Sequence, residues 1–190
     1  MSATNAPFGL RPAFHPSGLD RAQALAGGIA SGYGSDILKG QPVRYVTGGT
    51  IEPAAAGQSF AGAFAGVEFT DTTGRRRVSN YWPASTAYQT GSCVAYFYND
   101  PLIVYEIQAD GSLAQTAIGD QADLSNTTAG SNVTGLSQAT LSTTLAGAGA
   151  SAQMRIVDLA PYPDNAWGDA YTVVRVTINE AQFQACVYPI

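Results

Sequence analysis

The chain has 190 residues, of which 45% are hydrophobic and only 12% charged, with a formal net charge of −5. Because soluble surfaces usually carry roughly 25–35% charged residues, this composition indicates that other subunits cover part of the surface. Because its net charge is negative, the chain lacks the excess of basic residues that binding to a phosphate backbone requires, so no direct nucleic-acid partner is expected.

The first expected element is an extended N-terminal arm, residues 1–17. Its three prolines exclude a helix, because proline fixes φ and removes a hydrogen-bond donor. Apolar side chains fall on alternate positions, the period of an extended chain with one apolar face: Phe8, Leu10, Pro12 and Phe14. The arm lies either across its own domain or against a neighbouring subunit, and the residues leave both alternatives open. In the second case the candidate intersubunit contacts are Phe8, Leu10, Arg11 and Phe14.

Residues 18–190 are expected to form one β-rich domain. Short apolar runs separated by Gly, Pro, Asn and Asp are typical of antiparallel sheets with many turns. The predicted strands are residues 23–31, 42–47, 60–70, 78–82, 92–98, 102–108, 153–159 and 171–178. The fold class is therefore mainly β, a single antiparallel β-barrel or sandwich-like domain.

Two short segments predict the local course of the chain. Residues 60–67 alternate large with tiny side chains, and glycine within a strand marks a bend or a close backbone approach, as barrel curvature would require. Residues 99–101, Asn-Asp-Pro, predict a hairpin between the strands on either side, and residues 109–111 end the second strand with turn chemistry. These strands are expected to form a meander.

Residues 119–150 are dominated by Ser, Thr, Ala and Gly. The isolated leucines Leu136, Leu141 and Leu145 look too sparse for a core element, so we expect a long excursion with weak strands that rests against a surface. A loop of this length in a compact domain is usually functional or disordered.

The cluster Arg75, Arg76 and Arg77 follows the turn-forming residues 71–74, which places it at a hairpin tip or on the strand that leaves it. One alternative is a solvated, positively charged tip. The other is an interface in which guanidinium groups bridge to carboxylates of an acidic neighbour.

Side chains that support catalysis are scarce. The chain has one histidine, His15, and one lysine, Lys39, and its cysteines Cys93 and Cys186 lie too far apart in sequence for a zinc or dyad pattern. Whether the two cysteines pair stays open. We expect no catalytic site, no metal and no cofactor. Residues 1–7 lack signal-peptide features, and no apolar run approaches the roughly 18–20 residues of a membrane span, so we expect a cytoplasmic origin and no membrane partner.

Two weaker patterns bear on this expectation. Oxygen ligands occur close together at Asp164, Asn165 and Asp169, but their spacing does not match a calcium-binding EF-hand. A glycosidase needs two carboxylates facing each other across a cleft, and such pairs can be proposed in any β protein. The available carboxylates are Glu68, Asp100, Glu106 and Asp110.

The order of several motifs resembles a group of virion structural proteins of tailed bacteriophages. The motifs span most of the chain: residues 5–12 (NAPFGLRP), 62–67 (GAFAGV), 81–84 (YWPA), 99–101 (NDP), 106–111 (EIQADG), 163–169 (PDNAWGD) and 176–180 (VTINE). The resemblance implies a capsid decoration or cement protein, a β-rich homo-oligomer and often a trimer, on the outside of the head. It implies the major capsid protein as partner and the virion as location, after synthesis in the host bacterial cytoplasm.

Two rival functions remain at this point. A carbohydrate-binding or other accessory β domain of the virion would show exposed tryptophan or tyrosine along a groove, whereas buried Trp82 and Trp167 would favour the decoration protein. An enzyme would show a pocket with convergent carboxylates.

Overall fold

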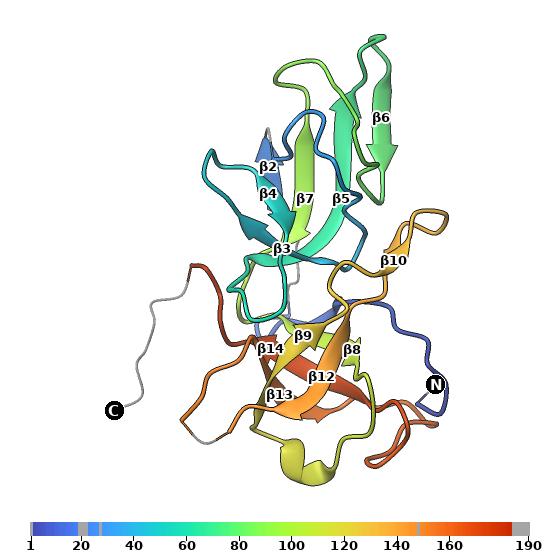
Figure 1. Cartoon of the computed structure of the whole chain (residues 1–190), viewed down its shortest axis with the longest axis vertical. Coiled ribbons are helices and arrows are strands. Elements are labelled where there is room, and N and C mark those ends of the chain that lie inside the picture. The colour runs from blue at the N-terminus through green and yellow to red at the C-terminus, as the bar shows by residue number, and fades with distance from the viewer. Residues whose placement is uncertain (1, 19–22, 27, 148, 184–190) are drawn as a thin grey trace.

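Two open antiparallel sheets, stacked along the longest axis, form an upper and a lower lobe (Figure 1). The computed structural model describes residues 2–18, 23–26, 28–147 and 149–183. In order across the upper sheet, the strands are β2 (Gln23–Ala26), β7 (Val94–Tyr98), β5 (Gly62–Thr70), β3 (Pro42–Tyr45) and β4 (Ile51–Pro53), and β6 (Arg76–Ser79) pairs with β5.

The lower sheet also has six strands. In order across it, they are β1 (Arg11–Phe14), β8 (Val104–Gln108), β14 (Val173–Ile178), β13 (Met154–Leu159), β9 (Gln121–Ser125) and β12 (Thr140–Leu145). A small hairpin of β10 (Gly130–Ser131) and β11 (Leu136–Ser137) lies beside the junction of the lobes, and one 3-10 turn, η1 (Gln115–Ala117), precedes β9. The prediction of a mainly β chain with antiparallel sheets is confirmed.

Strand β14 shows why these segments form strands. Val174, Val176 and Ile178 are buried in the core of the lower lobe, whereas Arg175 and Thr177 between them stay half-buried. Apolar side chains every second residue bury one face of an extended chain. The burial of these three side chains follows the alternation, and Val173 at the start of the opposite face is buried as well.

The lower sheet curls around its core. An isolated bridge joins Ala109, just after β8, to Leu141 on β12, and the Asp110 amide donates to the Leu141 carbonyl at 2.9 Å. The strand order nevertheless ends at β1 and β12, so the sheet is curled but open.

The glycines of β5 allow the close backbone approach that the sequence predicts. A Cβ at Gly62 would lie 1.6 Å from the carbonyl oxygen of Tyr98 on β7. The register between β5 and β7 shifts between Phe64 and Gly66, which marks an irregularity in the pairing. Glycine is required at position 62 because any side chain would overlap the neighbouring strand.

Each lobe has its own core. The upper core is built around Phe64, Trp82 and Phe97, and the lower core around Tyr105 and Met154. The lower core also takes in residues of the upper sheet and its loops: Ala54, Phe60 and Ala63. The lobes are therefore joined by shared apolar packing, and the extent of a single domain over residues 18–190 stays a prediction.

The predicted hairpin at residues 99–101 is wrong. The segment on its N-terminal side is β7 of the upper sheet, and the segment on its C-terminal side is β8 of the lower sheet. Asp100 does form a local turn, because its carbonyl accepts from the Ile103 amide at 3.2 Å. That turn carries the chain from one lobe to the other, and turn chemistry specifies a local change of direction without specifying which strands pair.

The prediction that residues 119–150 contribute no core element is also wrong. Strands β9 and β12 belong to the lower sheet, and Leu124 and Leu141 are completely buried. The reason is that alanines share the buried positions: Ala122 lies two residues before Leu124, and Ala139 two residues before Leu141. Small side chains suffice there, so leucine spacing alone underestimates the buried face.

Candidate functional site

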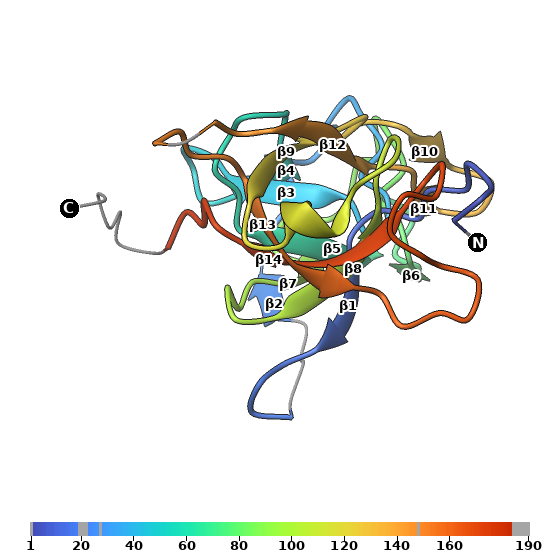
Figure 2. The same ribbon diagram turned by 90° about the horizontal axis from the view of Figure 1, so that it is seen from below.

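The N-terminal segment is part of the lower sheet. Strand β1 pairs with β8 at the margin of the molecule (Figure 2). Leu10 is 1% exposed, belongs to the lower core and donates its amide to the Gly40 carbonyl at 2.8 Å. The side chain of Leu10 therefore packs inside its own chain, as expected if the arm lies across its own domain, and a contact of the segment with a neighbouring subunit stays a prediction.

The other three residues predicted on this segment keep exposed surface. Phe14 is 43% exposed, and the guanidinium of Arg175 lies 5.4 Å from the centre of its ring. Phe8 is half-buried, with the Arg11 guanidinium 4.5 Å from its ring centre. The register shift between Pro12 and Phe14 breaks the predicted alternation of one apolar face.

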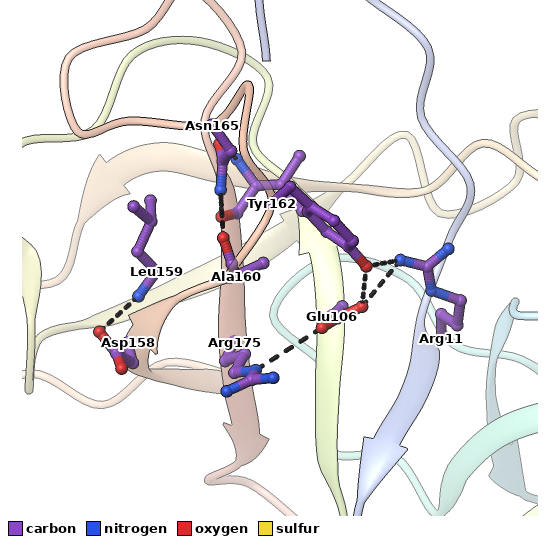
Figure 3. Close-up of polar contacts among 9 residues, drawn as sticks. Arg11, Glu106, Asp158, Leu159, Ala160, Tyr162, Asn165 and Arg175 are labelled. Carbon is purple, nitrogen blue, oxygen red and sulfur yellow. Dashed lines mark hydrogen bonds and ion pairs between the residues drawn. The ribbon is translucent and has the colours of Figure 1, made fainter. Parts of the chain in front are cut away.

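A buried carboxylate fastens this segment to the sheet (Figure 3). Glu106 on β8 is 7% exposed and accepts a hydrogen bond from Arg11 on β1 at 2.7 Å. Arg175 on β14 forms an ion pair with the same carboxylate at 3.6 Å. The hydroxyl of Tyr162 donates to Glu106 and accepts from Arg11. We call Arg11, Glu106, Tyr162 and Arg175 the Glu106 cluster.

The cluster keeps Glu106 ionised. Burial raises the pKa of the Glu106 carboxyl, but the hydrogen bonds from Tyr162 and Arg11 and the charges of Arg11 and Arg175 outweigh it, so the pKa lies below its ordinary value. Burial and the bond to Glu106 raise the pKa of the Tyr162 phenol, which therefore remains a donor. A low-pKa carboxylate surrounded by donors is a poor proton acceptor, so the cluster suits a structural role.

The three arginines lie at the far end of the upper lobe, on the hairpin of β5 and β6 (Figure 1). Arg76 pairs with Glu68 across the hairpin at 2.7 Å, and Arg77 pairs with Asp71 in the turn at 3.0 Å. Arg75 is exposed, as is Val78, whose side chain is 73% accessible. The predicted hairpin position is confirmed, and the N-terminal segment lies in the other lobe, so the two predicted contact regions are not brought together.

Asp71 shapes the hairpin tip. Its Oδ1 accepts from the Thr73 hydroxyl at 2.6 Å and from the backbone amides of Thr73 and Arg75 at 3.0 and 2.9 Å. The Thr73 hydroxyl, the Arg75 amide and Arg77 lower the pKa of Asp71 against the opposing effect of desolvation. The turn therefore presents its arginines on a fixed backbone.

The carboxylates considered for catalysis do not converge. Apart from Glu106, each has its own partner: Arg76 for Glu68 at 2.7 Å, His15 for Asp100 at 3.1 Å and the Thr143 amide for Asp110 at 2.9 Å. The two rings of tryptophan are used in packing, since Trp82 is buried in the upper core and Trp167 packs half-buried on the lower core.

In the loop that contains Asp164, Asn165 and Asp169, side chains form hydrogen bonds with the backbone. The side-chain Nδ2 of Asn165 donates to the Ala160 carbonyl at 2.8 Å (Figure 3). It also donates to the Val173 carbonyl at 2.8 Å, and the Asp169 carboxylate accepts from the Ala166 amide at 2.8 Å. No group of three or more His, Cys, Asp or Glu suited to a metal ion occurs among the described residues. Cys93 is buried in the upper core, where desolvation raises its pKa, and Cys186 lies outside the described residues.

Two hollows are relevant to binding. A cleft of about 730 Å³, lined by Tyr33, Asp36, Glu52 and Asn132 among others, lies between loops of the upper lobe and the β10–β11 hairpin. We call it the polar cleft. A smaller pocket of about 390 Å³ lies where the N-terminal segment meets the upper lobe. No helix in the described part of the chain is long and apolar enough to cross a membrane.

Comparison with protein-family models found no match for this chain. The comparisons with curated proteins and with solved structures likewise found none.

Proposed function

We propose that this chain is a non-enzymatic structural protein of a tailed-phage particle. It binds the outside of the capsid and stabilises joints between subunits of the major capsid protein. The sequence resemblance described above supplies the identity of the partner. The structural observation that carries the proposal is the β5–β6 hairpin, which projects three arginines and the exposed Val78 at one end of an otherwise acidic chain.

The chemistry of the hairpin suits an acidic protein surface. A guanidinium has five N–H donors, so Arg76 and Arg77 retain donors beyond those that contact Glu68 and Asp71. No ion pair joins Arg75 to any other described residue. An exposed ion pair contributes only about 0.2–1 kcal/mol, so a stable complex needs several contacts at once. Multivalent attachment of an oligomer supplies that number.

The oligomer is the second part of the proposal. Large apolar side chains are exposed on or beside the lower sheet, namely Phe14, Leu102 and Val157. Burying such side chains between copies of the chain would remove apolar surface from water, which favours a homo-oligomer, and we propose a trimer. In this arrangement the exposed side of the N-terminal arm contacts a neighbouring subunit. The two sheets of each subunit pack in a sandwich-like manner that supports these contacts.

Electron microscopy of the particle that carries the protein tests the proposal directly, by position and copy number. The variant test replaces Arg75, Arg76 and Arg77 by glutamine, which removes the charge without creating repulsion with Glu68 or Asp71. We expect particle binding to weaken about tenfold while the melting temperature changes little. The matched control is Arg155→Gln, an exposed arginine of the lower lobe. Equal binding by the triple variant would remove the hairpin from the interface.

The polar cleft favours a second candidate, a carbohydrate-binding accessory domain of the virion. Tyr33 lines the cleft beside Asp36 and Glu52, and an aromatic ring with nearby hydrogen-bonding groups is a common arrangement for sugar recognition. Calorimetric titration with bacterial surface polysaccharides, compared for the native chain and Tyr33→Ala, tests this candidate. Saturable binding that is lost in the variant would favour it over the decoration role.

A further inference from the structure

The smaller pocket combines an apolar interior with a cationic rim. Leu10 of the lower core and Phe64 of the upper core form part of its lining, together with Phe8, Tyr98 and Leu136. Its volume of about 390 Å³ falls in the range of ligand sites, which is roughly 300–1,000 Å³. We call it the junction pocket, because its lining comes from both lobes and from the β10–β11 hairpin.

Backbone hydrogen bonds hold the walls of the junction pocket together. The Leu10 amide donates to the Gly40 carbonyl at 2.8 Å, and the Gly40 amide donates to the Phe64 carbonyl at 2.7 Å. The Ser137 amide of β11 donates to the Lys39 carbonyl at 3.0 Å. Residues 39 and 40 therefore connect three separate parts of the chain, and a ligand meets a pocket that is already formed.

The rim carries two positive charges. Lys39, the only lysine of the chain, is exposed, and no ion pair joins its ammonium to any described residue. Arg11 is held in place by Glu106 and Tyr162 through one terminal nitrogen, Nη2, and its other N–H groups donate to no described residue. No carboxylate belongs to the described lining of the pocket. In a chain of net charge −5 this is a local reversal of sign.

We propose that the junction pocket binds an extended peptide segment of a partner protein that places an apolar side chain beside a carboxylate. The apolar side chain packs against the accessible rings and methyls of Phe8 and Leu136, and the carboxylate pairs with Lys39 and Arg11. The positive charges of Lys39 and Arg11 favour a peptide with an acidic residue next to its apolar one. The exposed side chain of Leu136 extends the apolar surface beyond the pocket, where the rest of the peptide can lie. This site is separate from the arginine hairpin and does not depend on the virion role.

The test uses the full chain, labelled with ¹⁵N, and a capped probe peptide of sequence Gly-Ser-Asp-Phe-Asp-Ser-Gly. We expect saturable shifts of the Lys39, Gly40 and Leu136 amide signals with a dissociation constant of about 1 mM or tighter. Two control peptides replace both aspartates by lysine or the phenylalanine by alanine. Absence of saturation, or equal binding by the lysine peptide, would overturn the proposal.

Two variants locate the binding. Lys39→Gln changes an exposed side chain and should weaken probe binding about threefold or more. Leu136→Asp should abolish the binding, whereas the matched control Ile118→Asp, an aliphatic side chain that is also 43% exposed but lies outside the pocket, should leave it unchanged. Unaltered affinity in Lys39→Gln, or equal losses in the two aspartate variants, would show that the peptide binds elsewhere.

Discussion

Arg11 and Glu106 are 95 positions apart in sequence, yet they face each other across the β1–β8 pair at a hydrogen-bond distance of 2.7 Å. The contact fixes the N-terminal segment on the lower sheet. It also gives Arg11 a defined orientation at the rim of the junction pocket.

Glu106→Gln tests the strength of this attachment. The substitution keeps the shape of the side chain but removes the charge that two guanidiniums face, so we expect a loss of about 1–3 kcal/mol in the free energy of unfolding. The measurement is urea unfolding at neutral pH. The matched control is Glu52→Gln, since Glu52 pairs with Arg44 at 2.7 Å on a more exposed site, where about 1 kcal/mol or less is expected. Equal losses would mean that the Glu106 cluster acts as an ordinary surface pair.

The same carboxylate makes stability depend on pH. The pKa of Glu106 is lower in the folded chain than its ordinary value of about 4.3, so the folded state binds fewer protons than the unfolded state. This contribution is present above that ordinary value and is lost as the pH falls through the folded pKa. In urea unfolding between about pH 6 and pH 3, the free energy of unfolding should fall less steeply with decreasing pH for Glu106→Gln than for the native chain. Part of the slope should remain, because the pKa values of Asp71 and Asp169 are also lowered.

Leu10→Ala distinguishes a core segment from a free arm. Leu10 is buried, so removing its side chain should destabilise the chain by about 2–5 kcal/mol. Phe14→Ala, at an exposed position of the same segment, should cost about 1 kcal/mol or less. Deletion of residues 1–17 should lower the melting temperature strongly. A deleted chain that melts like the native one would restore the free-arm interpretation.

Gly9→Ala tests the crossing between the N-terminal segment and the loop before β3. Gly9 has φ +71°, and a Cβ there would lie 2.6 Å from the Gly40 carbonyl oxygen. We expect a loss of about 1–3 kcal/mol in the free energy of unfolding and weaker probe binding at the junction pocket. Gly18→Ala is the matched control, since Gly18 has φ +79° with no atom within 4 Å of the added Cβ. The control should cost about 1 kcal/mol, from backbone strain alone.

Strand positions could be predicted because apolar alternation is a local property. All eight predicted strands overlap observed ones, and in β14 the alternation of Val174 and Val176 with Arg175 identifies the buried face directly. The pairing of strands is not local. The turn at Asp100 has the composition of a hairpin, but the two strands that it joins find better partners in different sheets.

The Glu106 cluster could not be predicted for a related reason. In β8 the apolar Tyr105 and Ile107 belong to the core, and Glu106 lies on the opposite face, which such alternation predicts to be exposed. That face is buried as well, by side chains from distant parts of the chain, so the sequence gives no sign that Glu106 is buried. Its partners come from β1, β14 and the loop that contains Tyr162. The hairpin arginines were identifiable because Asp71 and Gly74 form their turn within a few residues.

The division of the lobes along the chain sets the order in which they can form during synthesis. Among the described residues, the buried members of the upper core all lie between Ile29 and Phe97, so this core can form as soon as that stretch has left the ribosome. The lower core contains residues from Leu10 to Ile178. Strand β1 pairs with β8, which is synthesised only after all the strands of the upper sheet. Such distant contacts close slowly because the loop entropy is lost before the pairing is gained. The upper lobe should therefore gain protection from proteolysis first on stalled nascent chains.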